Sequence, residues 1–210
     1  FAREALDFIR RNKDRPFFFY GAFTIPHAEV AVPDDSLAEY RGKWPEPKAF
    51  PGSKTYAPQT QPRAVRAAMI TRLDRDVGRI LDLLDELKLS ESTLVLFSSD
   101  NGPITAGGQD PEFFDRNGPL RDLKFTLYEG GIRVPFIARW PGRIAKGSES
   151  ALVSDFADMF PTFGELAGAR VPPELDGVSI LPTLTGRSGQ QKQRDHLYWE
   201  AAPQQAVRRG

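Results

Sequence analysis

The sequence predicts an α/β fold, in which helices cover a sheet on both faces. Two uncharged apolar runs, Phe17–Phe23 and Thr93–Phe97, are typical of strands that are buried on both sides. Between them, apolar residues recur at steps of three and four from residue 62 to residue 87. This spacing predicts an amphipathic helix that packs against the sheet and leads into the second strand.

Composition limits the classes of partner. Lys and Arg together number 28, as do Asp and Glu, and this balance indicates neither a nucleic-acid nor a membrane-surface partner. No apolar run is long enough to cross a bilayer. Because the 210 residues include no cysteine, disulfides, thiolate metal sites and a cysteine nucleophile are excluded within this stretch.

Both ends of the chain are expected to be internal to a longer protein. Residues 1–11 begin within a helical pattern, with neither an initiator Met nor a capping residue. The other end follows directly on a strand-like segment. We therefore expect a fragment, and any feature that is absent here can lie outside it.

The first strand ends in a turn that carries a histidine. After a first helix and a polar turn at residues 12–16, Phe17–Phe23 leads into Thr24–His27, where Pro26 stops the strand. A lone histidine after a proline is most often a loop residue. However, His27 would lie at the end of a buried strand, which is also the position of the residues that follow Thr93–Phe97. Residues 28–62 show no period and are expected to form a long surface loop, of a kind that is often functional or mobile.

The second strand leads into Asp100, Asn101 and Gly102. In open α/β sheets this is where ligands bind, and a carboxylate beside a carboxamide offers two oxygen donors to a hard divalent cation. The alternative is a polar turn, since Asp-Asn-Gly tolerates positive φ without any metal. On these residues alone the turn is the better interpretation.

Further elements follow. Lys124 lies between two glycine-bearing turns and is by default a surface charge. The pattern predicts a third strand at Phe136–Trp140, a helix at Ser154–Ala167 that Pro161 bends, a loop at Asp176–Leu184 and an edge strand at His196–Ala201.

Several motifs recur together in one order. They are Pro16–Tyr20 with Thr24–His27, Leu73–Leu81, Ser99–Pro103, Gly118–Arg121, Tyr128–Pro135, Arg139–Gly142, Asp158–Thr162 and Asp176–Ser179. This ordered set resembles the sulfatase family, the formylglycine-dependent sulfuric ester hydrolases. The resemblance implies an alkaline-phosphatase-like fold, with a mixed, mostly parallel sheet sandwiched by helices. Residues 1–185 would be the second half of the catalytic domain, and 186–210 the start of a smaller C-terminal α+β subdomain.

The resemblance also implies site residues, and it favours the metal site over the turn. Asp100 and Asn101 match two calcium ligands of the family, and Lys124 matches the lysine that holds the sulfate. His27 matches the histidine that hydrogen-bonds the sulfate or protonates the leaving oxygen. The expected substrate is a small-molecule or carbohydrate sulfate ester, and the expected location is periplasmic or extracellular.

Other parts of the family pattern are absent or altered. No serine here lies in a Ser-x-Pro-x-Arg motif, so the formylglycine, the remaining calcium ligands and a basic pair are expected before Phe1. Ile104 and Gln109 replace histidines that many members carry, and Asp122 replaces a usual glycine. Two alternatives stay open: a phosphomonoester or phosphonate hydrolase of the same superfamily, and a non-catalytic relative that binds carbohydrate.

Overall fold

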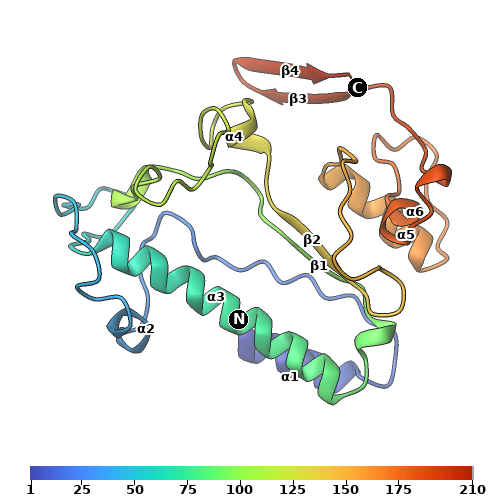
Figure 1. The fold of residues 1–210 in the computed structure, drawn as a ribbon, viewed down its shortest axis with the longest axis horizontal. Coiled ribbons are helices and arrows are strands. Elements are labelled where there is room, and N and C mark those ends of the chain that lie inside the picture. Colours follow the sequence, from blue (N-terminus) through green and yellow to red (C-terminus); the bar gives the residue numbers. More distant parts are fainter. Residues whose placement is uncertain (210) are drawn as a thin grey trace. The chain divides into compact units, whose positions relative to one another are not determined.

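The computed structural model describes residues 1–209 and contains two compact units. The first consists of Phe1–Leu89 with Asp100–Val134, and the second of Ser90–Ser99 with the chain from Pro135 onward. In chain order the elements, with η marking 3₁₀-helices, are α1 (Ala2–Asn12), α2 (Asp34–Ala38), α3 (Pro62–Glu86), η1 (Ser90–Ser92), β1 (Val95–Ser98), η2 (Ala106–Gly108), α4 (Glu129–Ile132), β2 (Phe136–Arg139), η3 (Phe156–Asp158), α5 (Met159–Leu166), α6 (Leu181–Leu184), η4 (Ser188–Gln190), β3 (Leu197–Ala201) and β4 (Gln204–Arg208) (Figure 1). No helix within residues 1–209 is both long and apolar enough to cross a membrane.

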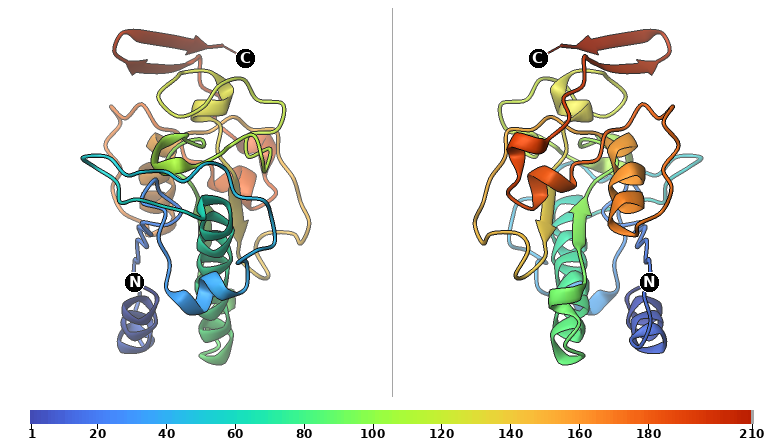
Figure 2. Two further views of the ribbon diagram at one scale, coloured as in Figure 1. Left: turned by 90° about the vertical axis from the view of Figure 1, so that its left-hand side faces the viewer. Right: turned by 90° about the vertical axis from the view of Figure 1, so that its right-hand side faces the viewer.

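Two helices form the base of the first unit. Helices α1 and α3 lie side by side, as Figures 1 and 2 show. Helix α1 buries Ala5, Leu6 and Ile9, which recur at helical spacing on one face. Helix α3 has the bounds that its apolar period predicts, so the sequence-based prediction of this long helix is confirmed.

The long loop before α3 is folded onto that helix. Val30 packs with Val65 and Met69 of α3 in a buried cluster, against which Ile25 and Leu37 also pack. Farther along, the carboxylate of Glu46 accepts hydrogen bonds of 2.9 Å from the backbone N–H groups of Arg63 and Ala64. Glu46 therefore caps α3, whose first N–H groups have no partner within the helix.

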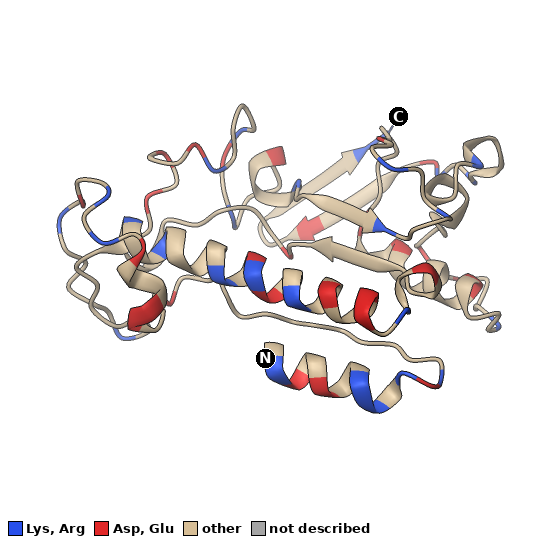
Figure 3. Cartoon of the chain, turned by 60° about the horizontal axis from the view of Figure 1, so that its bottom comes forward, with Lys and Arg blue, Asp and Glu red and all other residues tan. Residues whose placement is uncertain are grey.

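The charges of α3 are unevenly distributed. Basic residues dominate its first half, and its last charged residues, Asp82, Asp85 and Glu86, are all acidic (Figure 3). A helix dipole favours the opposite order, because the first turn of a helix is its positive end. The start of α3 is therefore a region of concentrated positive charge.

The predicted buried strand at Phe17–Phe23 is wrong. No strand is assigned to this segment within residues 1–209, and Phe18 and Tyr20 are 65% and 78% exposed. The run is extended and packs through Phe17 and Phe19 against Phe8 of α1, with ring centroids 6.0 and 5.5 Å apart. An apolar run favours extended backbone, but a strand also requires neighbouring backbone to pair with it in a ladder.

The second unit contains the two strand pairs. Strand β1 pairs antiparallel with β2, with Val95 opposite Arg139 and Ser98 opposite Phe136. The predicted strands at Thr93–Phe97 and Phe136–Trp140 are thus confirmed with shifted ends, but β1 is half-buried rather than covered on both faces. Strands β3 and β4 form an antiparallel hairpin. All strand pairs within residues 1–209 are therefore antiparallel.

The predicted helix at Ser154–Ala167 begins later than its apolar pattern indicates. A turn of 3₁₀-helix, η3, precedes α5, which starts at Met159. Pro161 lies in the first turn of α5, where a backbone N–H has no partner within the helix, so Pro161 does not interrupt it. The expected loop at Asp176–Leu184 ends in the short helix α6.

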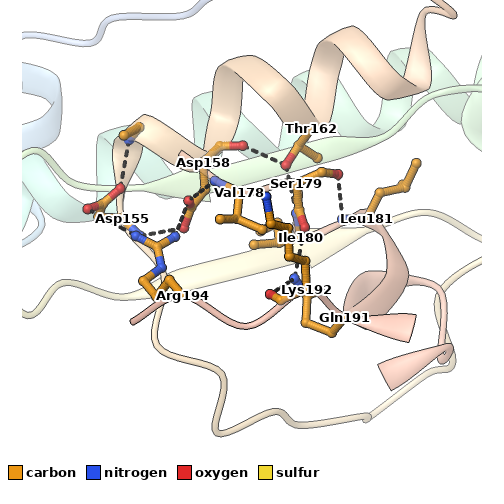
Figure 4. A network of polar contacts seen from close by, with 11 residues as sticks. Asp155, Asp158, Thr162, Val178, Ser179, Ile180, Leu181, Gln191, Lys192 and Arg194 are labelled. Carbon is orange, nitrogen blue, oxygen red and sulfur yellow. Dashed lines mark hydrogen bonds and ion pairs between the residues drawn. The ribbon is translucent and has the colours of Figure 1, made fainter. Parts of the chain in front are cut away.

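A buried polar network joins these helices to the chain that follows them (Figure 4). Asp158 is fully buried, and its carboxylate accepts hydrogen bonds from the backbone N–H of Asp155 and Val178 and from the guanidinium of Arg194. The hydroxyl of Thr162 donates to the Asp158 carbonyl at 2.6 Å and accepts from the N–H of Ile180 at 3.0 Å. Every polar group of this centre is thereby paired, as burial requires.

Candidate active site

His27 lies in a tight turn that is held on both sides. Its N–H donates to the carbonyl of Thr24 at 3.1 Å. On one side Ile25 packs against the cluster of α3, and on the other Ala28 is fully buried. The imidazole itself is exposed, with the Tyr56 ring centroid 6.4 Å away. The backbone of this turn is therefore fixed, while the His27 side chain remains accessible.

Asp100 and Asn101 are the first residues of Asp100–Val134, the second portion of the first unit, and the chain continues from them into η2. Asp100 is exposed, and Asn101 is half-buried, with its Nδ2 donating to the carbonyl of Gly102 at 3.0 Å. The N–H of Gly102 donates to Gly131 at 2.9 Å. A Cβ atom at Gly102 would lie 1.8 Å from the carbonyl oxygen of Gly130, so only glycine fits here.

The glycine of the Asp-Asn-Gly motif has a packing role. None of the residues 100–102 has positive φ in the described part of the chain. The glycine is required because two backbones approach each other closely, and the loop is clamped beside Gly130 and Gly131. Glycine is therefore needed at residue 102 for close packing of two backbones rather than for positive φ.

Lys124 is anchored to the same segment. Its backbone N–H donates to the carbonyl of Pro103 at 2.8 Å, and its Nζ lies 5.5 Å from the centroid of the Phe125 ring. Asp122 precedes it with a φ of 67°, in the left-handed region where glycine is favoured and Asp is among the better tolerated residues. The Asp122 carboxylate accepts a hydrogen bond of 2.9 Å from the N–H of Leu123. The chain thus accommodates Asp122 while the Lys124 backbone stays tied to Pro103.

Gln109 ties His27 to the far end of this segment. Gln109 is 6% exposed, and its Nε2 donates to the His27 carbonyl at 3.0 Å. Nearby, a Cβ atom at Gly107 would lie 2.0 Å from the carbonyl oxygen of Ala28. Residues 102–109 consequently contact the backbone of Lys124 near their start and the backbone of His27 at their end.

The four expected site residues are therefore connected through one short segment. Within residues 1–209, no group of three or more His, Asp or Glu side chains is arranged to hold a metal. Asp100 and Asn101 supply two oxygen donors that are suited to a hard cation.

Sequence reasoning missed two arginines beside this segment. The guanidinium of Arg66 donates from Nη1 to the carbonyl of Pro26. Arg116 donates from Nη1 to Oε1 of Gln109 at 2.5 Å and from Nη2 to the carbonyl of Ile104 at 3.1 Å. One signal was available: residue 66 lies one helical turn after residue 62 and one turn before residue 69, on the apolar face of α3, where an arginine is unexpected.

Burial affects the charges of both arginines. Desolvation and, secondarily, the positive charge of Arg116 lower the pKa of Arg66 to about 10. Desolvation also lowers the pKa of Arg116, against the attraction of Asp110. Both side chains remain protonated at neutral pH. The backbone around His27 is thus flanked by two partly desolvated positive charges.

Comparison with known proteins places the chain in a family. The family model described as Sulfatase matches residues 1–169. The whole chain is 36% identical to N-acetylgalactosamine-6-sulfatase of Canis lupus familiaris, and 88% of it is 34% identical to steryl-sulfatase of Rattus norvegicus. The chain spans 36% and 29% of the lengths of these two relatives.

A solved structure supports the same assignment. The crystal structure of Ps i-CgsB in complex with k-i-k-neocarrahexaose superimposes with a TM-score of 0.78 at 27% identity. The match covers 99% of this chain and 43% of that chain. A family model that matches most of the residues and a relative aligned over the whole length agree with this fold similarity. The chain belongs to the sulfatase family.

Proposed function

We propose that the protein hydrolyses a sulfate monoester, with His27 and Lys124 as catalytic residues and Asp100 and Asn101 as two calcium ligands. The observation that supports these roles best is the segment 100–109, which carries the two ligands at its start and is hydrogen-bonded to the backbone of Lys124 and of His27. The formylglycine nucleophile and the remaining ligands would come from parts of the protein outside residues 1–210.

The donor chemistry at Asp100 and Asn101 fits calcium. Both side chains bring oxygen, which hard cations prefer, and one of them is charged. Because Nδ2 of Asn101 is the atom that binds Gly102, Oδ1 is the atom of this amide that would coordinate a cation. Two donors fill only part of the six to eight positions that calcium takes. When bound, calcium would neutralise charge on the sulfate and polarise its sulfur.

The proposed roles of the two catalytic residues follow from their charges. Lys124 holds the negatively charged sulfate with a compact positive charge that also stabilises the charge developing as the S–O bond breaks, and its anchored backbone restricts where that charge lies. His27 protonates the leaving oxygen as the S–O bond breaks, which an accessible imidazole on a fixed turn can do.

The finer architecture belongs to the same proposal. We infer a mixed, mostly parallel sheet of the alkaline-phosphatase type, in which 1–185 form the second half of the catalytic domain. Residues 186–210 would begin the smaller C-terminal subdomain, and the location would be periplasmic or extracellular. The proposed substrate is a carbohydrate or other small-molecule sulfate ester. The name of the canine relative and the oligosaccharide in the Ps i-CgsB structure support the carbohydrate.

The direct test is an assay of the full-length protein with calcium, comparing an aryl sulfate, a sulfated monosaccharide and an aryl phosphate. We expect hydrolysis of the sulfate esters and its loss on calcium chelation. Turnover of the phosphate alone would favour a phosphomonoester hydrolase. Binding of sulfated sugars without turnover of any ester would indicate a non-catalytic relative.

A further inference from the structure

Two hydrogen bonds hold the backbone on either side of the His27 Cα atom. The guanidinium of Arg66, on helix α3, donates to the carbonyl of Pro26, and Nε2 of Gln109 donates to the carbonyl of His27 at 3.0 Å. The peptide unit before His27 is also held at its N–H, which donates to the carbonyl of Thr24 at 3.1 Å. Both planar peptide units that meet at this Cα atom are therefore held in place.

Holding these two peptide units fixes the direction of the His27 side chain. A residue has only two soft backbone dihedrals, φ and ψ, and each rotates one of the flanking peptide units about Cα. With both units held, the Cα–Cβ bond of His27 has one direction. The imidazole is exposed, and its ring centroid lies 6.4 Å from that of Tyr56. The held backbone therefore restricts where this exposed ring can lie.

Arg66 is unfavourable for stability at its position. It lies on the apolar face of α3, one turn from Pro62 and one turn from Met69, which are both fully buried. Its Nε is inaccessible to solvent and has no hydrogen-bond partner within residues 1–209. Desolvation and the positive charge of Arg116 both disfavour the charged form of Arg66 and lower its pKa to about 10. An apolar side chain of similar length would avoid these costs.

A residue that is unfavourable for stability is best explained by activity. Departures from the rules of packing and polar pairing are expected at functional sites, where a more stable replacement commonly lowers function. What Arg66 contributes there is its hydrogen bond to the Pro26 carbonyl, directly before His27.

We propose that Arg66 is a positioning residue, which directs the His27 imidazole toward the leaving oxygen by holding the Pro26 carbonyl. The proton moves from His27 to the leaving oxygen as the S–O bond breaks, and Arg66 acts only through the backbone of His27. Acid catalysis requires the donor to lie within hydrogen-bond reach of that oxygen, and a displacement of about 1 Å can cost about a hundredfold in rate. This inference rests on the proposed function, because it requires His27 to be the general acid.

The test compares Arg66→Met with the parent, as full-length proteins with calcium, on phenyl sulfate and p-nitrophenyl sulfate. The two esters have similar shapes, but phenol is a weaker acid than nitrophenol, so its departure depends more on protonation. We expect Arg66→Met to lower kcat on phenyl sulfate by about tenfold to a hundredfold, with little change on p-nitrophenyl sulfate or in either KM. Its denaturation midpoint is expected to equal or exceed that of the parent.

Three further variants separate positioning from general effects of charge and folding. Arg75→Met removes an equal charge from the exposed face of the same helix and is expected to leave both kcat values unchanged. Arg66→Lys keeps a donor for the Pro26 carbonyl and is expected to retain more kcat on phenyl sulfate than Arg66→Met. In a His27→Ala background, Arg66→Met is expected to lower kcat no further, because residues that act as a unit fail together.

The outcomes distinguish this inference from the proposed function. Equal losses on both esters, a loss in Arg66→Lys as large as in Arg66→Met, or a further loss in the His27→Ala background would overturn the positioning role. A loss of kcat that accompanies a lower denaturation midpoint would assign Arg66 to folding and overturn it as well. Each of these results leaves the proposed function intact. A His27→Ala variant with the kcat of the parent on phenyl sulfate would contradict the proposed role of His27, and the inference with it.

Discussion

The side-chain amide of Gln109 donates a hydrogen bond of 3.0 Å to the backbone carbonyl of His27, 82 residues earlier in the chain. Its Oε1 accepts from Arg116, so the amide is used at both ends in an almost fully buried position. Gln109 stands where many sulfatases carry a histidine. In the structure Gln109 positions the backbone of His27.

Replacing Gln109 by alanine is therefore expected to affect both stability and turnover. The change leaves the His27 carbonyl and a donor of Arg116 without partners, which typically costs about 1–3 kcal/mol of unfolding free energy. We expect a lower denaturation midpoint and a lower kcat, because the His27 turn loses one of its supports. Gln190→Ala, at an exposed position, is the control. Unchanged stability of Gln109→Ala would show that the bond is dispensable.

Lys124→Ala is expected to lower kcat by about a hundredfold or more. Removing one donor that stabilises transition-state charge typically costs roughly 2.7–4 kcal/mol. The measurement is steady-state hydrolysis of an aryl sulfate by the full-length protein with calcium. Lys146→Ala, on an exposed loop, should retain full activity. A Lys124→Ala variant as active as the parent would return Lys124 to an ordinary surface charge.

Calcium affinity is expected to fall more for Asp100→Ala than for Asn101→Ala. The carboxylate contributes a negative charge to the cation, whereas the amide contributes only a dipole. Calcium titration of the full-length variants, followed by calorimetry, measures this difference without relying on activity. If both variants bind calcium as tightly as the parent, neither residue is a ligand.

Acid is expected to weaken the Arg63–Asp110 contact. A hydrogen bond from Arg63 holds the pKa of Asp110 below its ordinary value of 3.8. A carboxyl group with a lowered folded-state pKa stabilises the protein above its unfolded-state pKa, and this contribution disappears as the pH falls through the folded-state value. The unfolding free energy should thus decrease below about pH 4, and less steeply in Asp110→Asn. Parallel pH profiles of the two proteins would disprove the contribution.

How much of the fold and of the candidate site could be predicted from the sequence depends on how far apart in the chain the interacting residues lie. Helix α3 and strands β1 and β2 follow from local periodicity, and their positions agree with the structure. The failed strand at Phe17–Phe23 depends on pairing with backbone elsewhere, which no local pattern reports. The contacts of Gln109 are equally distant along the chain, so its sequence position gave no indication of its partner.

Asp122 illustrates a different limit. The usual glycine at this position is explained by a φ of 67°, but a single sequence does not report φ, and Asp is among the few residues that tolerate such a value. The sequence therefore identified a departure from the family pattern without revealing that the backbone had remained compatible with it.

The last prediction concerns the buried pair of Asp158 and Arg194. The Asp158 carboxylate is fully buried, and Arg194 is the only cation among the three donors that surround it. Removing one partner of a buried ion pair leaves the other charge desolvated and typically costs about 3–5 kcal/mol. We expect Arg194→Met to destabilise the protein by roughly that amount. Asp158→Asn keeps the shape of the side chain and loses its charge, so we expect it to lower the unfolding free energy less in an Arg194→Met background than alone. Denaturant unfolding of the two single variants and the double variant measures the coupling. Additive effects would mean that Arg194 and Asp158 contribute independently and that the backbone donors alone satisfy the carboxylate.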